Sequence, residues 1–505
     1  MAEITNVVIR KNSNNEPATC LVTGATGYIG GRLIRELLNI GYKVKVFARF
    51  PDRLRDMPWF EKVEIISGDA LKSEDVEKAM QNVDVAYYLL HALNKGNEFV
   101  EIETKMAQIF ADSAKKNRVQ RIIYLGGLIP SQKLSQHLES RKITGEILRN
   151  SGISTIELRA GVVIGSGSAS FEMLRYLTER LPIMVTPRWV KTKIQPIAVR
   201  DVLYYLVGSA GIKEDLNQAF DIGGPDILTY KEMMNRYAKV ADLRKRIIIP
   251  VPLLTPRLSS LWVGFVTPVP GSIARPLVKS LINEVICQDN SIKKYLPDPQ
   301  GGLTNFEKAV DLALIRVRDA QVSTRWSSAS IPGIPSEPMP SDPEWSGGSL
   351  YKDVRVQEIN KSSNEVWKIV EAIGGNNGYF SFDWAWEIRG FLDRIVGGVG
   401  LRRGRRDPNS LHVGETLDFW RVEERIPDNI LRLRAEMKMP GKAWLEFKVE
   451  TIGEDKCKLT QRAIFYPKGL AGHAYWWLIA PFHVFVFPGI IKNIAKTAEK
   501  NINVK

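Results

Sequence analysis

The glycine-rich segment Thr23–Gly31, with the sequence TGATGYIGG, constrains the fold of this chain more than any other feature. A β-branched run, ATCLVT, leads into it, and the stretch YIGGRLIRELLNI overlaps its end. In that stretch the apolar residues from Ile29 to Leu38 recur at helical spacing, which turns one apolar face toward a sheet. A strand, a glycine turn and a helix in this order are typical of the first unit of a parallel β-α-β sheet.

The alternation of strands and helices continues far beyond this turn. Short β-branched runs such as KVKVFA, VEIIS, VDVAYYLL and RIIYLG are separated by helical stretches, one of them long and beginning after Gly96. The pattern predicts an α/β fold with a doubly wound, Rossmann-like parallel sheet. The alternation runs to about residue 240. We expect the part of the chain from about residue 160 onward to form a substrate cleft. Proline-punctuated apolar segments then lead into a helix predicted near residues 274–286.

A change of composition divides the chain. At 505 residues it is too long for one ordinary hydrophobic core. Five prolines with Ser and Gly lie between Ser327 and Gly348, a composition that sustains neither helix nor sheet. We therefore predict a loose extension at 1–17 without a secretory signal, a first domain at 18–326, a linker at 327–344 and a second domain at 345–505.

The second domain has a different character. Eight of the twelve tryptophans fall at or after Trp345. Strand-like segments such as SLYKDVRVQEI, ILRLRAEMKM, AWLEFKVETI and CKLTQRAIFYP follow one another without crossover helices, which predicts an antiparallel sheet. A helical segment, SNEVWKIVEAIGG, precedes most of them, and a long apolar segment closes the chain. We expect an α+β domain with a helix across a curved sheet.

The glycine turn has the features of a dinucleotide site. Gly24 permits a tight turn, Gly27 lets the backbone approach a pyrophosphate, and Gly30 permits close packing of helix and strand. The helix N-terminus adds free N–H groups and a positive dipole. The alternative is a tight turn that holds no ligand. The residues of this predicted contact are Gly24, Thr26, Gly27, Tyr28, Ile29 and Gly30.

The end of the second strand favours NADP over NAD. NAD-binding domains generally place Asp or Glu there, about 20 residues after the glycines. The strand KVKVFARF ends in Arg49 instead, and Arg53 follows one helical turn later. These guanidiniums could hold a 2′-phosphate, which a carboxylate would repel. Alternatively, both arginines face solvent.

Two further strand ends supply candidate contacts. Asp69 and Ala70, in SGDA after the third strand, are placed to meet the adenine. Leu90 and His91, at the end of the fourth strand, are placed to line the ribose. The alternative for both pairs is an ordinary structural role at a strand end.

TGATGYIGG, the GDA after the third strand and GGPDILTYKEMM further on together resemble the short-chain dehydrogenase/reductase superfamily, of the extended or atypical kind. The resemblance covers about residues 18–320. It implies hydride transfer, for which typical members use a Tyr-x-x-x-Lys pair and a Ser or Thr on the preceding strand. This chain departs from that pattern: His137 and Arg141 stand at the Tyr and Lys positions, and Gly126 or Gly127 at the hydroxyl position.

His137 and Arg141 are therefore the catalytic candidates. His137 could shuttle a proton near neutral pH, and Arg141 could hold a phosphate or carboxylate. Alternatively, both are surface residues. The departure puts ordinary Tyr-dependent reduction in doubt.

The segments DPEWSGGSLYKD, LDFWRVEE, EMKMPGKAWLEF and the stretch from Phe382 to Pro408 resemble a bacterial domain of unknown function that is fused to atypical reductases. That domain is similar to the START or polyketide-cyclase type, a helix-grip fold that encloses an apolar ligand. The match covers about residues 345–500 and implies an architecture, not a reaction.

The net charge of +14 is spread along the chain. GGVGLRRGRR could receive a phosphate or lipid headgroup, or is a basic loop paired with acidic neighbours, and its shortness argues against nucleic-acid binding.

Three distant cysteines disfavour disulfides and indicate a reducing, cytoplasmic setting. His473 and His483 lack acidic partners at ligand spacing, so no metal site is predicted. The arginines concerned are Arg402, Arg403, Arg405 and Arg406, and the cysteines are Cys20, Cys287 and Cys457.

The most apolar stretch, His473–Ile491, is broken by Pro481 and Pro488 and barely reaches the roughly 20 residues of a spanning helix. It is either the closing helix of the second domain or an interfacial segment, with Trp476 and Trp477 at headgroup level on the inner membrane face.

Three functions are compatible with these features. The first is an NADP-dependent oxidoreductase or epimerase-like enzyme that acts on a hydrophobic small molecule. The second is a non-catalytic NADP-sensing protein, and the third a lipid-handling protein at the membrane surface.

Overall fold

The structure, a computed structural model, describes residues 7–55, 57–91, 99–130, 134–251, 267, 283–318, 349–375, 378–379, 381, 386, 388–390, 393, 411–453 and 455–499. The chain divides into two compact units, Met1–Gly348 and Ser349–Lys505. The predicted linker at 327–344 and the four arginines of GGVGLRRGRR lie outside the described residues.

The N-terminal unit is built on a seven-stranded parallel sheet in the order β11-β6-β5-β4-β1-β2-β3. The direction of strand addition reverses between β1 and β4, which creates a crevice at their carboxyl ends. The predicted doubly wound parallel sheet is confirmed. Its strands are β1 (Thr19–Thr23), β2 (Lys43–Ala48), β3 (Glu64–Ser67), β4 (Val85–Tyr88), β5 (Arg121–Gly127), β6 (Ser154–Ala160) and β11 (Gln218–Ile222).

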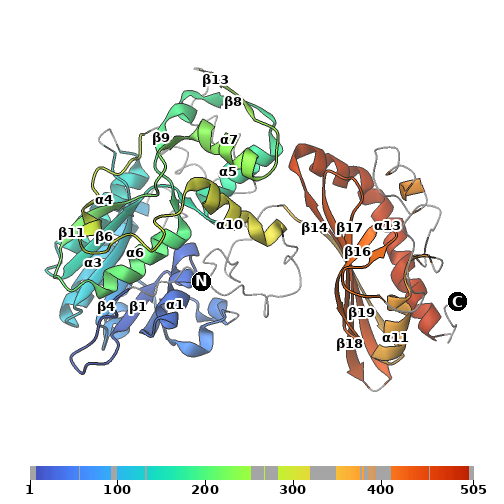
Figure 1. The fold of residues 1–505 in the computed structure, drawn as a ribbon. Helices are drawn as coiled ribbons and strands as arrows, with labels where there is room; N and C mark the ends of the chain where they lie inside the picture. The colour runs from blue at the N-terminus through green and yellow to red at the C-terminus, as the bar shows by residue number, and fades with distance from the viewer. Residues whose placement is uncertain are drawn as a thin grey trace. The chain divides into compact units, whose positions relative to one another are not determined.

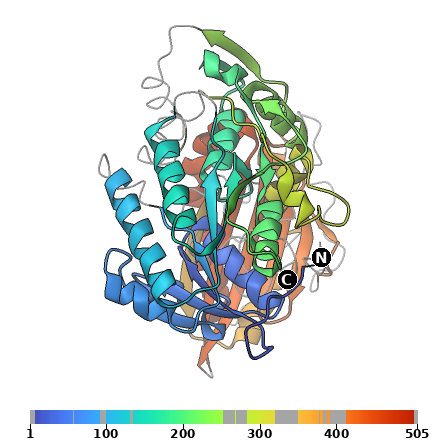
Figure 2. The ribbon, with the colours of Figure 1, turned by 90° about the vertical axis from the view of Figure 1, so that its left-hand side faces the viewer.

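Helices cover both faces of this sheet (Figures 1 and 2). In β1, Cys20 and Val22 belong to the core beneath α1 and α6, whereas Leu21 belongs to the core beneath α2 and α3. Alternate residues of a strand point to opposite faces, so a sheet covered on both sides is apolar throughout. The helices are α1 (Tyr28–Asn39), α2 (Ser73–Met80), α3 (Phe99–Lys116), α4 (Gln136–Arg149) and α6 (Val199–Gly211).

A smaller part of this unit has a core of its own, formed mainly by α5 (Ala169–Arg180), α7 (Tyr230–Val240) and α10 (Phe306–Arg318). The prediction of a helix near 274–286 is wrong at its end, because Val285 makes a parallel bridge with Ile194. The residues of that prediction before 283 lie outside the described ones. Three two-stranded sheets complete this part: β7 (Val163–Ile164) with β10 (Ile197–Ala198), β9 (Lys193–Ile194) with β12 (Leu228–Thr229), and β8 (Ile183–Pro187) with β13 (Ile247–Val251).

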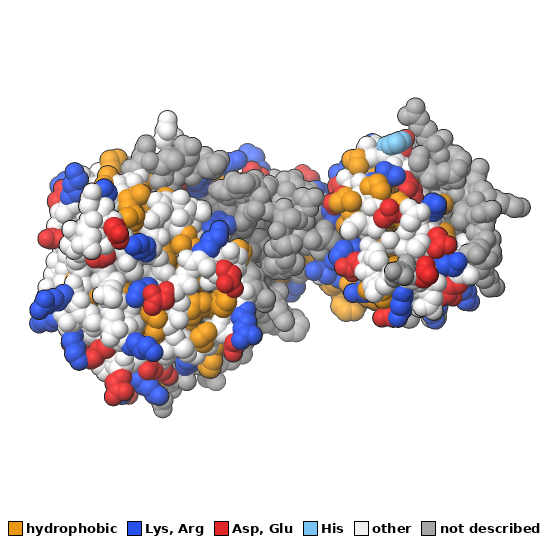
Figure 3. Space-filling view, turned by 90° about the horizontal axis from the view of Figure 1, so that it is seen from below, with side chains coloured by type: hydrophobic (Ala, Val, Ile, Leu, Met, Phe, Trp, Pro, Cys, Tyr) orange, Lys and Arg blue, Asp and Glu red, His pale blue; other side chains and the backbone are white. Residues whose placement is uncertain are grey.

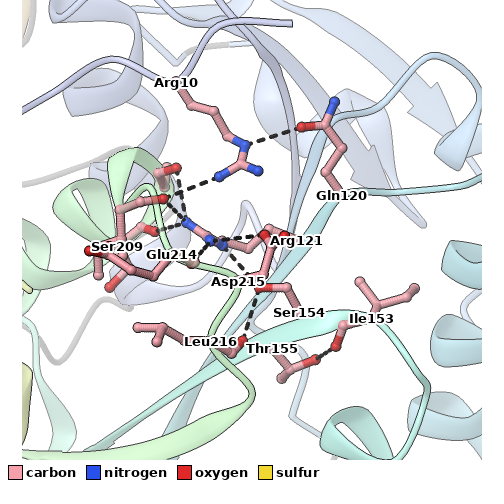
Figure 4. A network of polar contacts seen from close by, with 12 residues as sticks. Arg10, Gln120, Arg121, Ile153, Ser154, Thr155, Ser209, Glu214, Asp215 and Leu216 are labelled. Atoms are coloured by element: carbon pink, nitrogen blue, oxygen red, sulfur yellow. Dashed lines mark hydrogen bonds and ion pairs between the residues drawn. The ribbon is translucent and has the colours of Figure 1, made fainter. Parts of the chain in front are cut away.

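A buried arginine joins the amino end of β5 to the end of α6 and the residues that follow it. Arg121, at the start of β5, is fully buried, and its guanidinium donates hydrogen bonds to the carbonyl of Ser209 in the last turn of α6 and to those of Ile212 and Glu214 after it (Figure 4). Arg10 also reaches the Ile212 carbonyl, at 3.2 Å. A buried cation requires such partners, because desolvation otherwise opposes the charge.

The C-terminal unit contains a six-stranded antiparallel sheet in the order β14-β19-β18-β17-β16-β15. Helices α11 (Ser363–Glu371) and α13 (Gly469–Glu499) pack on one face, which we call the inner face. The predicted antiparallel sheet with a closing helix across it is confirmed (Figure 1). The strands are β14 (Tyr351–Ile359), β15 (Thr416–Leu417), β16 (Trp420–Ile426), β17 (Ile430–Ala435), β18 (Gly441–Gly453) and β19 (Lys456–Pro467).

Ion pairs cross the strands on the opposite, outer face. Glu446 of β18 is fully buried, and its carboxylate accepts hydrogen bonds from Arg432 at 2.7 Å and from Arg462 Nε at 2.7 Å. Elsewhere, charges of both signs are interspersed on the surfaces that Figure 3 presents. On those surfaces the net positive charge therefore forms no single patch.

The apolar stretch His473–Ile491 lies within α13. Within it Trp476 is only 8% exposed and stacks on Tyr351, whereas Trp477 is 68% exposed. In the described part of the chain, no single helix has the length and apolar content to cross a membrane. The halves Gly469–Pro481 and Val486–Glu499 meet that test only together, and they are bent by 54°.

Candidate functional site

The glycine turn closes tightly at the carboxyl end of β1. Gly24 has a φ of +70°, and a Cβ there would lie 2.6 Å from the Leu89 carbonyl oxygen. A Cβ on Gly30 would overlap the carbonyl of Gly24. Thr23 Oγ1 donates to the Tyr87 carbonyl and accepts from the Leu89 N–H, which joins the ends of β1 and β4. Only glycines fit this arrangement of backbone.

The turn presents the start of α1 to the crevice. Gly27 is the N-cap and makes no side-chain capping bond, and the first turn of the helix has no acidic residue. Thr26 and Gly27 are exposed, and Ile29 is half-buried. Uncapped N–H groups and the helix dipole favour an anion such as a pyrophosphate. The residues present therefore fit a dinucleotide.

Tyr28 extends from this turn toward the smaller part of the unit. The Arg32 guanidinium lies 4.1 Å from the centre of its ring. A Cβ on Gly165, just after β7, would collide with the Tyr28 hydroxyl oxygen. Tyr28 thus connects the glycine turn with the region where the sequence predicts a substrate cleft.

Arg49 follows β2 directly and is exposed, with its guanidinium 4.9 Å from the centre of the Phe50 ring. Arg53 lies in the short 3-10 helix Pro51–Leu54, but its side chain lies outside the described residues. Position 49 therefore carries a guanidinium, where NAD-binding domains generally carry the carboxylate of an Asp or Glu.

Asp69 and Ala70 lie half-buried at the end of β3. The Asp69 carboxylate accepts a hydrogen bond from the Leu71 N–H at 3.0 Å, and the Asp69 N–H donates to Asp75 at 2.9 Å. These bonds hold the loop in a fixed turn at the rim of the crevice.

A cluster of four polar residues lies beyond the end of β4, and we call it the histidine cluster: His91, Glu103, His137 and Ser140. His91 Nδ1 and Ser140 Oγ both donate to the carboxylate of Glu103, which is 2% exposed. The rings of His91 and His137 stack with centroids 5.1 Å apart. Three elements supply the cluster: the end of β4, α3 and α4.

Both imidazoles of the cluster have a lowered pKa. Burial lowers the pKa of His137 to about 3, with smaller contributions from His91 and Arg141. Burial and then Arg141 also lower the pKa of His91, against the opposing effect of Glu103. At pH 7 His137 therefore offers an N–H donor and a lone pair without positive charge.

Arg141 connects α4 to the carboxyl ends of β4 and β5. Its guanidinium donates to the carbonyls of Leu90 and Leu125 and lies 5.2 Å from the Tyr124 ring centre. The Tyr124 hydroxyl donates in turn to the Arg141 carbonyl at 3.0 Å. These bonds give Arg141 a positioning role, because they fix α4 and hence His137 against β4 and β5. Gly126 and Gly127, which end β5, supply no hydroxyl.

Sequence reasoning missed Glu103 and Ser140. The available signal was weak: Glu103 shares the helical spacing of Phe99, Met106 and Phe110, the buried face of α3. A carboxylate on an apolar helix face indicates a buried polar partner.

Two family models match separate parts of the chain. One, described as NAD(P)H-binding, matches residues 24–161. The other, described as a protein of unknown function, DUF2867, matches residues 345–490. The N-terminal unit is thus an NAD(P)H-binding Rossmann-like domain, and the C-terminal unit contains a DUF2867 domain.

Individual proteins match the chain at low sequence identity. The chain is 22% identical over 291 residues to the mitochondrial NADH dehydrogenase [ubiquinone] 1 alpha subcomplex subunit 9 of Arabidopsis thaliana, covering 54% of this chain and 71% of that protein. It is 22% identical over 240 residues to the ceramide reductase of Caulobacter vibrioides, covering 46% and 73%. The structure of the Citrobacter triphenylmethane reductase with NADP(H) aligns at 17% identity and a TM-score of 0.49, covering 59% of this chain and 100% of that chain.

Proposed function

We propose that this chain is an NADP(H)-dependent oxidoreductase that reduces a carbonyl group on a hydrophobic small molecule. The observation that carries the proposal is the closure of the glycine turn, in which Gly24 and Gly30 leave no space for a side chain beside the uncapped start of α1. The match of residues 24–161 to an NAD(P)H-binding family supports it.

Arg49 supports the choice of NADP. Its exposed guanidinium stands where an NAD-binding domain would place a carboxylate. A guanidinium can bind a 2′-phosphate through two parallel hydrogen bonds, whereas a carboxylate repels it. The residues proposed to hold the dinucleotide are Gly24, Thr26, Gly27, Tyr28, Ile29, Gly30, Arg49, Arg53, Asp69, Ala70, Leu90 and His91.

The histidine cluster handles the proton in this proposal. Reduction of a carbonyl adds a hydride to the carbon and one proton to the oxygen. A nicotinamide held at the glycine turn would supply the hydride. His137 donates a hydrogen bond from its neutral ring to the carbonyl oxygen. As that N–H proton passes to the oxygen, the other ring nitrogen takes up a proton from solvent, so the ring stays neutral. His91 positions the stacked ring, because Glu103 fixes its Nδ1–H.

The hydrophobic character of the substrate has separate support. The name of the Caulobacter relative, a ceramide reductase, indicates a lipid substrate for that protein, and it aligns with 46% of this chain.

The test is NADPH consumption by the purified full chain with a panel of apolar aldehydes, ketones and quinones. We expect turnover with at least one class, and at least 100-fold slower turnover in His137→Asn with unchanged NADPH affinity. His412→Asn, which changes an exposed histidine of the other unit, is the control. NADPH binding without turnover on the whole panel would contradict the oxidoreductase and favour a sensing role. Undiminished turnover in His137→Asn would remove that residue from the mechanism.

A further inference from the structure

We infer that the C-terminal unit encloses a second binding site, for a small apolar molecule that carries a carboxylate or carbonyl oxygen. A cavity of about 90 Å³ lies between the inner face of the sheet and α13. Its walls are mostly aromatic and aliphatic, and they include Trp386, Trp420, Leu445, Ala463, Phe465 and Ile479. This site belongs to one unit only and does not depend on the proposed reaction of the other.

Unsatisfied polar atoms gather at this cavity. In the described part of the C-terminal unit, five buried side-chain polar atoms have no hydrogen-bond partner, and three belong to residues that line the cavity. These three are the indole Nε1 atoms of Trp386 and Trp420 and the Nδ1 of His483. The His483 Nδ1 lies 3.9 Å from the Asp353 carboxylate, so the two indoles carry the inference. The other two, on Arg355 and Gln461, belong to residues paired across β14 and β19.

Trp420 is the clearest case. It is 4% exposed, so water at the surface does not reach its indole N–H. Other indoles of the unit find protein acceptors: Trp444 donates to Glu423 at 3.0 Å, and Trp367 donates to Glu371 at 2.8 Å. Folded proteins rarely leave a buried donor unpaired, because its desolvation is then not offset. An acceptor inside the cavity supplies the missing partner.

The charged and polar side chains around the cavity indicate which kind of hydrogen-bond acceptor a ligand would bring. Arg389 lines the cavity and hydrogen-bonds to the Tyr475 hydroxyl, while no Asp or Glu occurs among the described lining residues. Burial lowers the pKa of His483 to about 4, so at neutral pH this ring adds no charge. Two indole donors and one guanidinium favour an oxygen, neutral or anionic, and disfavour an amine.

The volume limits the size of the ligand. At roughly 30 Å³ per water, the cavity holds about three waters or the polar end of an organic molecule. Met437 and Met439 line it, and flexible thioethers let the walls adapt to a ligand of ring size. A lipid chain does not fit whole. Ordered water alone is the alternative that the experiment must distinguish.

The experiment follows the indole N–H signals of the full chain, labelled with ¹⁵N only in tryptophan, by nuclear magnetic resonance. The probes are benzoate, benzaldehyde and benzylamine, which share a ring and differ in the head group. We expect benzoate and benzaldehyde to shift the two signals that disappear in Trp386→Phe and Trp420→Phe, and benzylamine to leave them in place.

Affinity provides the second readout. Trp420→Phe should weaken benzoate at least fivefold, because one charge-assisted hydrogen bond is lost. Trp444→Phe is the matched control: Trp444 is also one of the residues around the cavity, but its indole donates to Glu423, so binding should change less than twofold. If Trp420→Phe fails to fold, the indole shifts that benzoate, benzaldehyde and benzylamine cause in the native chain still test the inference. Equal losses in the two variants, or indole signals that no probe moves, would overturn the inference and leave a cavity filled by water.

Discussion

In the N-terminal unit the candidate ligand groups lie at the carboxyl ends of parallel strands, whereas in the C-terminal unit they lie on the inner face of an antiparallel sheet. The parallel sheet is covered by helices on both faces, so its interior is apolar and only the strand ends remain for polar chemistry. The antiparallel sheet is covered by helices on one face, and a cavity remains between the two layers. The layer architecture thus decides where each unit can bind a ligand.

The largest expected effect tests whether the two units are stabilised independently. Arg121→Met removes a buried guanidinium that donates to the carbonyls of Ser209, Ile212 and Glu214. Arg10 still donates to the Ile212 carbonyl and the Leu216 N–H to that of Glu214, so the largest loss is the buried charge itself with its packing. We expect a loss of about 4 kcal/mol in the free energy of unfolding of the N-terminal unit. Hydrogen exchange followed by mass spectrometry should show lost protection there and unchanged protection after residue 349.

Lys116→Met is the control for this variant, because its ion pair with Glu77 is exposed and is expected to contribute less than about 1 kcal/mol. An equal loss of protection in both units of Arg121→Met would break the comparison, because it would mean that they unfold as one.

The next effect concerns the glycine turn. Gly30→Ala places a methyl group on the carbonyl of Gly24, so the turn must open, and we expect NADPH binding to weaken at least 100-fold by calorimetry. The control is Gly453→Ala in the other unit, where a Cβ meets only Lys456 at 3.6 Å. NADPH affinity that survives Gly30→Ala would place the dinucleotide elsewhere.

Local signals explain what the sequence could predict. The parallel sheet and the glycine turn follow from patterns within about thirty residues, and the antiparallel sheet follows from strands without crossover helices. The histidine cluster could not be predicted, because His91, Glu103 and His137 are distant in sequence and meet only after α3 and α4 pack together. The different exposure of the neighbours Trp476 and Trp477 likewise depends on how α13 lies on β14.

A smaller effect tests the buried histidine of each unit. Both have a lowered pKa in the folded chain, about 3 for His137 and about 4 for His483, against 6.5 for the ordinary group. The unfolded chain therefore takes up protons first, and the free energy of unfolding falls as the pH falls from about 6.5 toward these values. His91, Glu103 and Arg141 face His137, and Asp353 and Arg355 face His483.

We expect His137→Asn and His483→Asn each to remove about 2 kcal/mol of the stability difference between pH 7 and pH 4, measured by urea unfolding. His412→Asn, which changes an exposed histidine, is the control variant. An unaltered pH dependence in one variant would show that its imidazole is already solvated in the folded chain.

The smallest and most direct test concerns the central claim that the N-terminal unit holds NADP(H) with Arg49 at the 2′-phosphate. Calorimetric titration of the full chain with NADPH and NADH should show NADPH at least tenfold tighter. Arg49→Ala should abolish that preference by weakening NADPH alone, and the exposed neighbour Arg55→Ala should preserve it. Equal affinity for the two dinucleotides in the native chain, or no binding of either, would contradict the account.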